Sequence, residues 1–384
     1  MIPALSLYLD VLRFTAAFVV FLSHYSPLHR SGGLFWQVGP YGRASVLAFF
    51  VLSGFVIAWV SQGKEANFQE YAISRIARLY SVIIPAFIMT AILDSIGMAL
   101  YPAIYQYSTG GFDTDNSIVN YLLSTFFLGQ SWILKVSPGS NLPFWSLNHE
   151  AWYYIIFACI IFFSGKRRVF LLLLAALLAG PKILLLFPVW LMGVAAWRIK
   201  DVIPQRLGPV LALGAVGGFI GLEMIGGQKL FVVTHTLWLP LDFSAYDYVV
   251  GTIVAILLCG IARSRLPMPG KKLTVAVHAL AGTTFGLYLF HFPLLNFFGS
   301  VLPGEPASLS HRVLLFTLTL GTALAAAALV ERRKSTLKRL LRATLKSPVA
   351  SGAPISPVAP ATPVTTGPIT SELIMRTPDR SFTG

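Results

Sequence analysis

Residues 46–60 read VLAFFVLSGFVIAWV, an apolar run without a charged side chain. Similar runs recur along the chain, at residues 14–22, 155–163, 210–222, 249–261 and 313–330. Of the 384 residues, 55% are apolar and 11% are charged, whereas about 25% are charged in an ordinary soluble domain. Such runs approach the ~20 residues that a helix needs to cross the hydrocarbon core of a bilayer. The composition therefore excludes an ordinary water-soluble fold.

The continuity of these runs indicates the fold class. Apolar residues follow one another without alternating with polar ones, which favours helices over a β-barrel in lipid. We expect an all-α, polytopic integral membrane helix bundle. The first segment contains Asp10 and Arg13 and lacks a clear small-residue cleavage site, so we expect a permanent span and not a signal peptide. The eleven candidate segments are 5–24, 42–61, 79–100, 118–134, 148–164, 168–180, 183–199, 207–225, 246–263, 278–299 and 312–330.

The basic residues predict how many segments cross the membrane. If all eleven crossed from a cytoplasmic N-terminus, the clusters at 166–168 and 263–272 would lie outside, against the positive-inside rule. The conflict disappears if the segment at 118–134 enters the membrane without crossing it. We therefore expect about ten transmembrane helices and one re-entrant segment, with both termini cytoplasmic. This topology accounts for the net charge of +14 without a nucleic-acid partner.

Composition also predicts the domain organisation. We expect a membrane domain over residues 1–335, a basic juxtamembrane segment over 336–346, and a disordered tail rich in Pro, Ala, Ser and Thr over 347–384. Cys159 and Cys259 are isolated within apolar runs, without the spacing of a metal site or a clear disulfide partner. We therefore predict no metal site.

Ionisable residues inside spans are candidate functional residues because they are costly in lipid. The first span contains Asp10, Arg13 and His24. Eleven residues turn a helix by about 1100°, so Arg13 and His24 share one face, roughly 16 Å apart along the axis. They could line one groove. Alternatively, Asp10 and Arg13 form a structural ion pair, and His24 hydrogen-bonds a neighbour at the membrane interface.

Two further elements have both structural and functional interpretations. Residues 49–55 read FFVLSGF, in which Ser53 and Gly54 permit close helix approach. Arg75 and Arg78 lie three residues apart at the start of the third span. They either anchor that span at the cytoplasmic surface or clamp a phosphate with their forked donors.

Two aromatic elements complete the set. Residues 143–154 read PFWSLNHEAWYY, and residues 288–293 read YLFHFP. Glu150 could simply complement the dipole at a helix N-terminus. The density of Trp, His, Glu and Tyr, however, exceeds what an aromatic belt requires. His291 lies beside a helix-kinking proline within an apolar span.

Taken in order, these elements resemble the acyltransferase 3 family of membrane-bound O-acyltransferases acting on carbohydrates. The resemblance covers about residues 5 to 330, without the extracytoplasmic hydrolase-like domain that some relatives carry. The matching elements are Asp10-x-x-Arg13 followed by His24, Phe49 to Phe55, Arg75-x-x-Arg78, Trp145-Ser146-Leu147-x-x-Glu150-x-x-Tyr153-Tyr154, and Tyr288-x-x-His291-x-Pro293.

The resemblance implies the reaction and its partners. It implies transfer of an acyl group, acetyl by default, from acyl-CoA to a hydroxyl of a polysaccharide, lipopolysaccharide or oligosaccharide. The expected partners are the lipid bilayer of the inner (plasma) membrane, acyl-CoA as donor substrate, and a carbohydrate or glycolipid acceptor. No permanently bound cofactor is expected. The alternatives are a transporter or flippase of a lipid-linked glycan and, with only its basic tail in favour, a sensor.

We combine the resemblance with the expected topology to predict roles. Arg75 and Arg78 would bind the donor phosphates, and Arg13 would hold the donor or stabilise the oxyanion. His24 would act as general base or, alternatively, carry the acyl group. Glu150, expected at the same outer side, would orient or charge-balance the His24 imidazole. The supporting residues would be Asp10, Ser53, Trp145, Ser146, Tyr153, Tyr288 and His291.

Overall fold

The computed structural model describes residues 3–63, 65, 67–105, 113–230 and 244–345. In these ranges the chain forms helices and no strand, so the predicted all-α class is confirmed. The helices are α1 (Pro3–Tyr25), α2 (Leu28–Ser31), α3 (Gly42–Val60), α4 (Phe68–Leu100), α5 (Pro102–Tyr105), α6 (Ile118–Thr125), α7 (Trp145–Phe162), α8 (Gly165–Ala179), α9 (Pro181–Ile199), α10 (Gly208–Met224), α11 (Gly227–Leu230), α12 (Ala245–Arg263), α13 (Lys271–Val301), α14 (Leu309–Glu331) and α15 (Lys334–Leu345).

The long helices are those of a multi-pass membrane protein. Within the described residues, eight helical segments are long and apolar enough to cross a bilayer, and they contain α1, α3, α4, α9, α10, α12, α13 and α14. The other two predicted spans, 148–164 and 168–180, correspond to α7 and α8. With 15 residues, α8 is only about 22 Å long, and α7 begins with polar turns. These two helices pack against each other.

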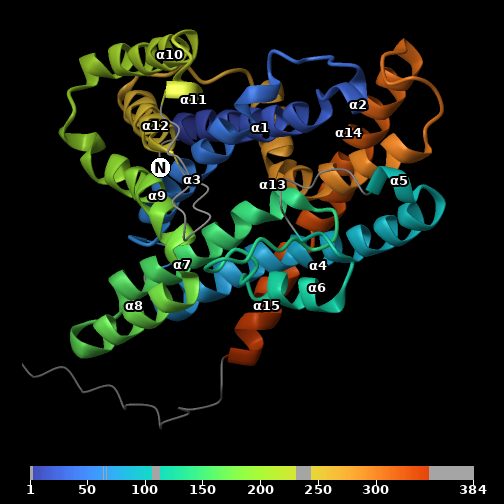
Figure 1. Cartoon of the computed structure of the whole chain (residues 1–384). Coiled ribbons are helices and arrows are strands. Elements are labelled where there is room, and N and C mark those ends of the chain that lie inside the picture. Colours follow the sequence, from blue (N-terminus) through green and yellow to red (C-terminus); the bar gives the residue numbers. More distant parts are fainter. Residues whose placement is uncertain (1–2, 64, 66, 106–112, 231–243, 346–384) are drawn as a thin grey trace, which may run out of the picture. The chain divides into compact units, whose positions relative to one another are not determined.

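The centre of the bundle is built on α1, which packs against both α3 and α13 (Figure 1). On its other side α3 packs closely against α9. A Cβ added to Gly193 would lie 1.9 Å from the Val51 carbonyl oxygen, and one added to Gly54 would lie 2.1 Å from the Trp190 carbonyl oxygen. Only glycine permits this approach, so the close packing expected next to Ser53 is present.

Contacts at one end of the bundle join the first residues of α1 to the α12–α13 connection. The Tyr8 hydroxyl donates to the Pro267 carbonyl over 3.1 Å. The Arg263 side chain donates to the Ile203 carbonyl over 2.7 Å and joins the end of α12 to the α9–α10 connection. This end gathers the predicted basic clusters of the chain, and we call it the basic end.

Contacts at the opposite end join the end of α1 to the start of α14 and the start of α3 to the start of α12. The Tyr25 hydroxyl at the end of α1 donates to the Arg312 carbonyl in the first turn of α14 over 2.8 Å. Arg43 at the start of α3 pairs with Asp247 at the start of α12 over 2.6 Å. The spans therefore alternate in direction between the two ends, as the charge pattern predicted.

The segment predicted to enter without crossing is not a continuous helix. Within residues 118–134, α6 ends at Thr125 and irregular backbone follows, with φ of 56° at Phe127 and 54° at Trp132. Phe127 is buried, and its carbonyl accepts from the Trp152 indole over 2.9 Å. This backbone enters the protein interior, where its polar groups find partners within the protein.

The basic segment after the last span continues as α15 along α4. Lys338 donates to Ser74 over 2.6 Å, and Arg342 pairs with Glu70 over 2.5 Å. Residues up to Leu345 belong to the same compact unit as the bundle. The predicted disordered tail, 347–384, lies outside the described residues.

Single-cysteine labelling tests this arrangement, because both native cysteines are buried. We expect Lys166→Cys and Arg265→Cys, exposed at the basic end, to react with an impermeant maleimide only after cells are permeabilised. Trp36→Cys and Glu305→Cys, exposed at the opposite end, should react in intact cells. Mixed behaviour within either pair would contradict the alternation of the spans. Reversal of both pairs would contradict only the cytoplasmic assignment of the basic end.

Candidate functional site

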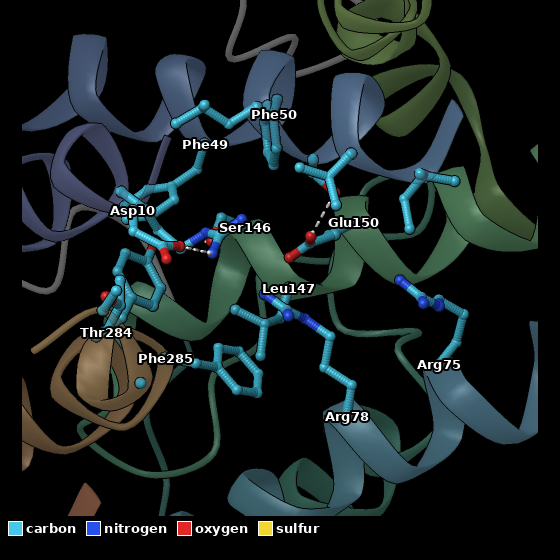
Figure 2. A pocket seen from close by; sticks show the side chains of 18 of the residues that line it. Asp10, Phe49, Phe50, Arg75, Arg78, Ser146, Leu147, Glu150, Thr284 and Phe285 are labelled. Carbon is cyan, nitrogen blue, oxygen red and sulfur yellow. Dashed lines mark hydrogen bonds and ion pairs between the residues drawn. The ribbon is translucent and has the colours of Figure 1, made fainter. Parts of the chain in front are cut away.

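A charged cavity of about 280 Å³ lies where α1, α3, α4, α7 and α13 meet. Figure 2 shows α4 side chains pointing into it from one side and α3 side chains from the other. It brings together eight of the residues that the sequence predicted for the site: Asp10, Arg13, Ser53, Arg75, Arg78, Ser146, Glu150 and Tyr288.

Arg75 already has a counter-charge in the protein. One of its terminal nitrogens lies 2.7 Å from each carboxylate oxygen of Glu65. Its guanidinium also lies 5.5 Å from the ring centres of Tyr71 and Tyr154. Because the side chains of Arg75 and Glu65 are only 13% and 9% exposed, this pair is a structural element of the cavity wall.

Arg78, one turn further along α4, has no such partner. It makes no ion pair or hydrogen bond with any residue that the structure describes, and its guanidinium points into the cavity (Figure 2). The ring of Phe285 lies 5.9 Å from it. The two arginines of the RxxR element therefore differ, and Arg78 is the one that a ligand anion can pair with.

Glu150 belongs to the charged cavity and not to the surroundings of His24. Ser53 donates to its carboxylate over 2.7 Å, and the Tyr154 hydroxyl donates to the same oxygen. The prediction that Glu150 orients the His24 imidazole is therefore wrong. The reason is that α7 begins at Trp145 in the protein interior, after the buried segment, and so carries Glu150 towards the basic end.

Asp10 and Arg13 form the predicted ion pair, 3.1 Å apart, and both line the charged cavity. The His278 ring nitrogen lies 2.8 Å from the other Asp10 oxygen. Sequence reasoning missed His278, and it also missed Glu331 and Lys334, which line the cavity from the junction of α14 and α15. The basic residues around this junction served only to predict the topology of the last span.

Tyr288 joins the charged cavity to a second, middle cavity of about 520 Å³, since it lines both. Its hydroxyl lies 2.7 Å from the Ser146 hydroxyl and donates to the Pro143 carbonyl over 3.0 Å. The two aromatic sequence elements thus meet here. Trp145 lines the middle cavity together with His24.

His24 in turn joins the middle cavity to a third, outer cavity of about 490 Å³. Its ring centre lies 5.4 Å from that of His291 and 4.8 Å from that of Phe292. Among the described residues, none hydrogen-bonds the ring nitrogens of His24. Three cavities therefore follow one another from the basic end towards the opposite end, with Tyr288 in the wall between the first two and His24 in the wall between the last two.

Two predicted supporting residues lie deeper in the protein. His291 is fully buried, and its Nδ1 lies 3.0 Å from the Leu287 carbonyl. Tyr153 packs between Phe50 and Trp190 in the apolar core and lines none of the three cavities. Within the described residues, no group of three or more potential ligands could hold a metal ion.

Comparisons with known proteins identify the class. The sequence profile of the acyltransferase 3 family, described as an acyltransferase domain, matches residues 6–332. The chain therefore belongs to this family. It is 28% identical over 153 residues to the acyltransferase MdmB of Streptomyces mycarofaciens, a match that covers 38% of this chain and 36% of that protein. No solved structure is a significant match.

The different environments of the two arginines predict different effects on stability. We expect Arg75→Met to lower the free energy of unfolding by about 3 kcal/mol, because Glu65 would remain buried without its counter-charge. Arg78→Met, the matched control, should change it by less than about 1 kcal/mol. Far-UV circular dichroism during SDS titration of the purified protein measures both. Equal losses would show that Arg78 also has a structural partner.

Proposed function

We propose that this protein is a membrane-bound O-acyltransferase that moves an acyl group, acetyl by default, from acyl-CoA to a hydroxyl of a surface or exported carbohydrate. Membership of the acyltransferase 3 family supports acyl transfer. The observation that carries the proposal is the series of three cavities, which runs from an arginine-lined cavity to the His24 imidazole, whose ring nitrogens have no hydrogen-bond partner among the described residues.

The charged cavity suits the phosphates of an acyl-CoA donor. Arg78 makes no ion pair with a described residue, and Lys334 lines the same cavity, together with the carboxylates of Glu150 and Glu331. The basic end is the cytoplasmic end by the positive-inside rule, which is where acyl-CoA is made. Arg13, held by Asp10, lies in this cavity, whereas His24 lies in the next. This separation favours a donor-binding role for Arg13 over stabilisation of an oxyanion at His24.

The acyl end of the donor would extend past Tyr288 into the middle cavity and reach His24. His24 accepts the proton of the acceptor hydroxyl while the hydroxyl oxygen attacks the thioester carbonyl. Collapse of the tetrahedral intermediate breaks the carbon–sulfur bond, and the leaving thiolate takes the proton from the imidazolium. In the alternative route, His24 itself attacks the thioester and passes the acyl group to the hydroxyl.

His291 is the candidate to orient His24, in the role that the sequence suggested for Glu150. A carbonyl can only accept, so the contact with Leu287 places the proton of a neutral His291 on Nδ1 and leaves Nε2 as an acceptor. Nε2 is buried and has no partner among the described residues. A ring separation of 5.4 Å is close to that of two imidazoles joined by an N–H···N bond of about 3 Å. Such a bond would leave the other His24 nitrogen free as the base.

A transporter or flippase of a lipid-linked glycan is the second candidate, because consecutive cavities through a bundle also suit transport. Release of free CoA separates the two. We expect purified protein to release CoA from acetyl-CoA when acceptor glycan is supplied. We expect Arg78→Ala to raise the apparent KM for acetyl-CoA at least tenfold, because a lost phosphate contact weakens binding in the ground state and in the transition state alike. Movement of the glycan across the membrane without release of CoA would support the transporter. An unchanged donor KM in Arg78→Ala would remove Arg78 from the donor site.

The two histidines give the sharpest test of the mechanism. We expect His24→Gln to lower kcat by about 10²-fold or more with acetyl-CoA binding unchanged, because glutamine keeps the hydrogen bonds and cannot take a proton. His291→Gln places an acceptor near Nε2 and should retain more activity than His291→Met, which has a similar volume without a good acceptor. Substantial activity in His24→Gln would exclude both routes through His24. Equal losses in the two His291 variants would indicate a packing role.

A further inference from the structure

The outer cavity lies beyond His24, on the side away from the charged cavity. It is formed where residues of α2, α4, α5 and α13 and the connection before α14 meet, and His24 forms part of its wall. Its volume of about 490 Å³ is in the range of small-molecule sites. The donor route through the charged and middle cavities does not use it. It is therefore available for a second substrate.

Arg30 supplies this cavity with a cation that has only neutral partners. One terminal nitrogen donates to the His24 carbonyl over 2.6 Å, and the other donates to the Asn296 side-chain oxygen over 2.7 Å. Its guanidinium lies over the Phe292 ring, 4.6 Å from the ring centre. Among the described residues, no carboxylate lies within ion-pair distance of it.

The charge of Arg30 persists despite its surroundings. Burial lowers the pKa of Arg30 to about 10, so the guanidinium is still protonated near neutral pH. Arg30 is half-buried, and a charge removed from water without a counter-charge is costly, so proteins normally pair such groups. The partner that Arg30 lacks among the described residues is an anion.

The carboxylate that lines the outer cavity is already used. Asp94 accepts from the Ser140 backbone nitrogen over 2.6 Å and from the Ser140 hydroxyl over 2.7 Å. It makes no ion pair with Arg30. His29 and His311 also line the cavity and add polar atoms to its wall. The cavity therefore has one engaged carboxylate and one guanidinium without a counter-ion.

We propose that the outer cavity binds the acceptor, and that Arg30 pairs with a carboxylate or phosphate on it. This inference rests on the proposed function, since it assigns the second substrate of the same transfer. The contact between Arg30 and the His24 carbonyl places the anion close to the base. The acylated hydroxyl and the anionic group therefore belong to the same sugar residue or to neighbouring ones, so the acceptor class is an acidic glycan. The forked guanidinium suits either anion.

The test measures occupancy of the cavity directly and does not need acyl transfer. Diethyl pyrocarbonate modifies histidines, and mass spectrometry of the His24 peptide gives the rate of its modification. Glucuronate and glucose 6-phosphate serve as anionic probes, and glucose serves as the neutral probe, all at matched ionic strength. At saturation we expect an anionic probe to slow modification of His24 roughly tenfold, because occupancy leaves about a tenth of the sites free. Glucose should leave the rate nearly unchanged.

Variants identify the residue responsible. Arg30→Gln should abolish the protection, Arg30→Lys should retain part of it, and Lys229→Gln, an exposed control at the same end, should retain all of it. Protection by glucuronate alone or by glucose 6-phosphate alone identifies the anion as carboxylate or phosphate. Equal protection by glucose, no protection by any probe, or full protection in Arg30→Gln overturns the proposal. Protection without CoA release in the enzyme assay would refute the transferase and keep the anion site.

Discussion

The cost of a charged group in an apolar bundle organises this structure. An ionised side chain can lie at a membrane surface, pair with an opposite charge, or face an internal cavity. Asp10 pairs with Arg13, and Glu65 pairs with Arg75. The first pair lines the charged cavity, and the second forms part of its wall. Arg78 and Arg30 face internal cavities and make no ion pair with a described residue. These two guanidiniums lie in different cavities, on opposite sides of His24.

Much of the fold could be predicted from the sequence because its cause is simple. Long apolar runs imply helices in lipid, and the basic clusters predict the alternation of the spans and a segment at 118–134 that does not cross. The exact lengths were harder, since α4 and α13 run for 33 and 31 residues, well beyond the predicted segments 79–100 and 278–299. Amino-acid pattern shows that a segment is apolar. It does not show at what depth within the bundle the helix begins.

The same limitation explains what was right and wrong about the site. Most of the predicted polar residues do meet in one cavity, because costly groups in neighbouring spans converge where they can contact one another. The pairing of Glu150 with His24 failed because the buried connection before α7 changes the depth at which Glu150 lies. Glu65, His278 and Lys334 were missed because each lies near a chain connection, where charge is ordinary. Tyr153 belongs to a recognisable element, yet it packs in the core.

His24 forms part of the wall of two cavities, and this position constrains the kinetic order. If the donor arm occupies the middle cavity and the acceptor occupies the outer cavity, the two substrates reach one imidazole from opposite faces. Neither must leave before the other binds. Transfer through a general base then passes through a ternary complex, and the thiol product and the acylated product depart towards opposite ends of the bundle. Each product would compete with its own precursor and not with the other substrate, so a high concentration of acylated glycan outside would not prevent the enzyme from loading its donor.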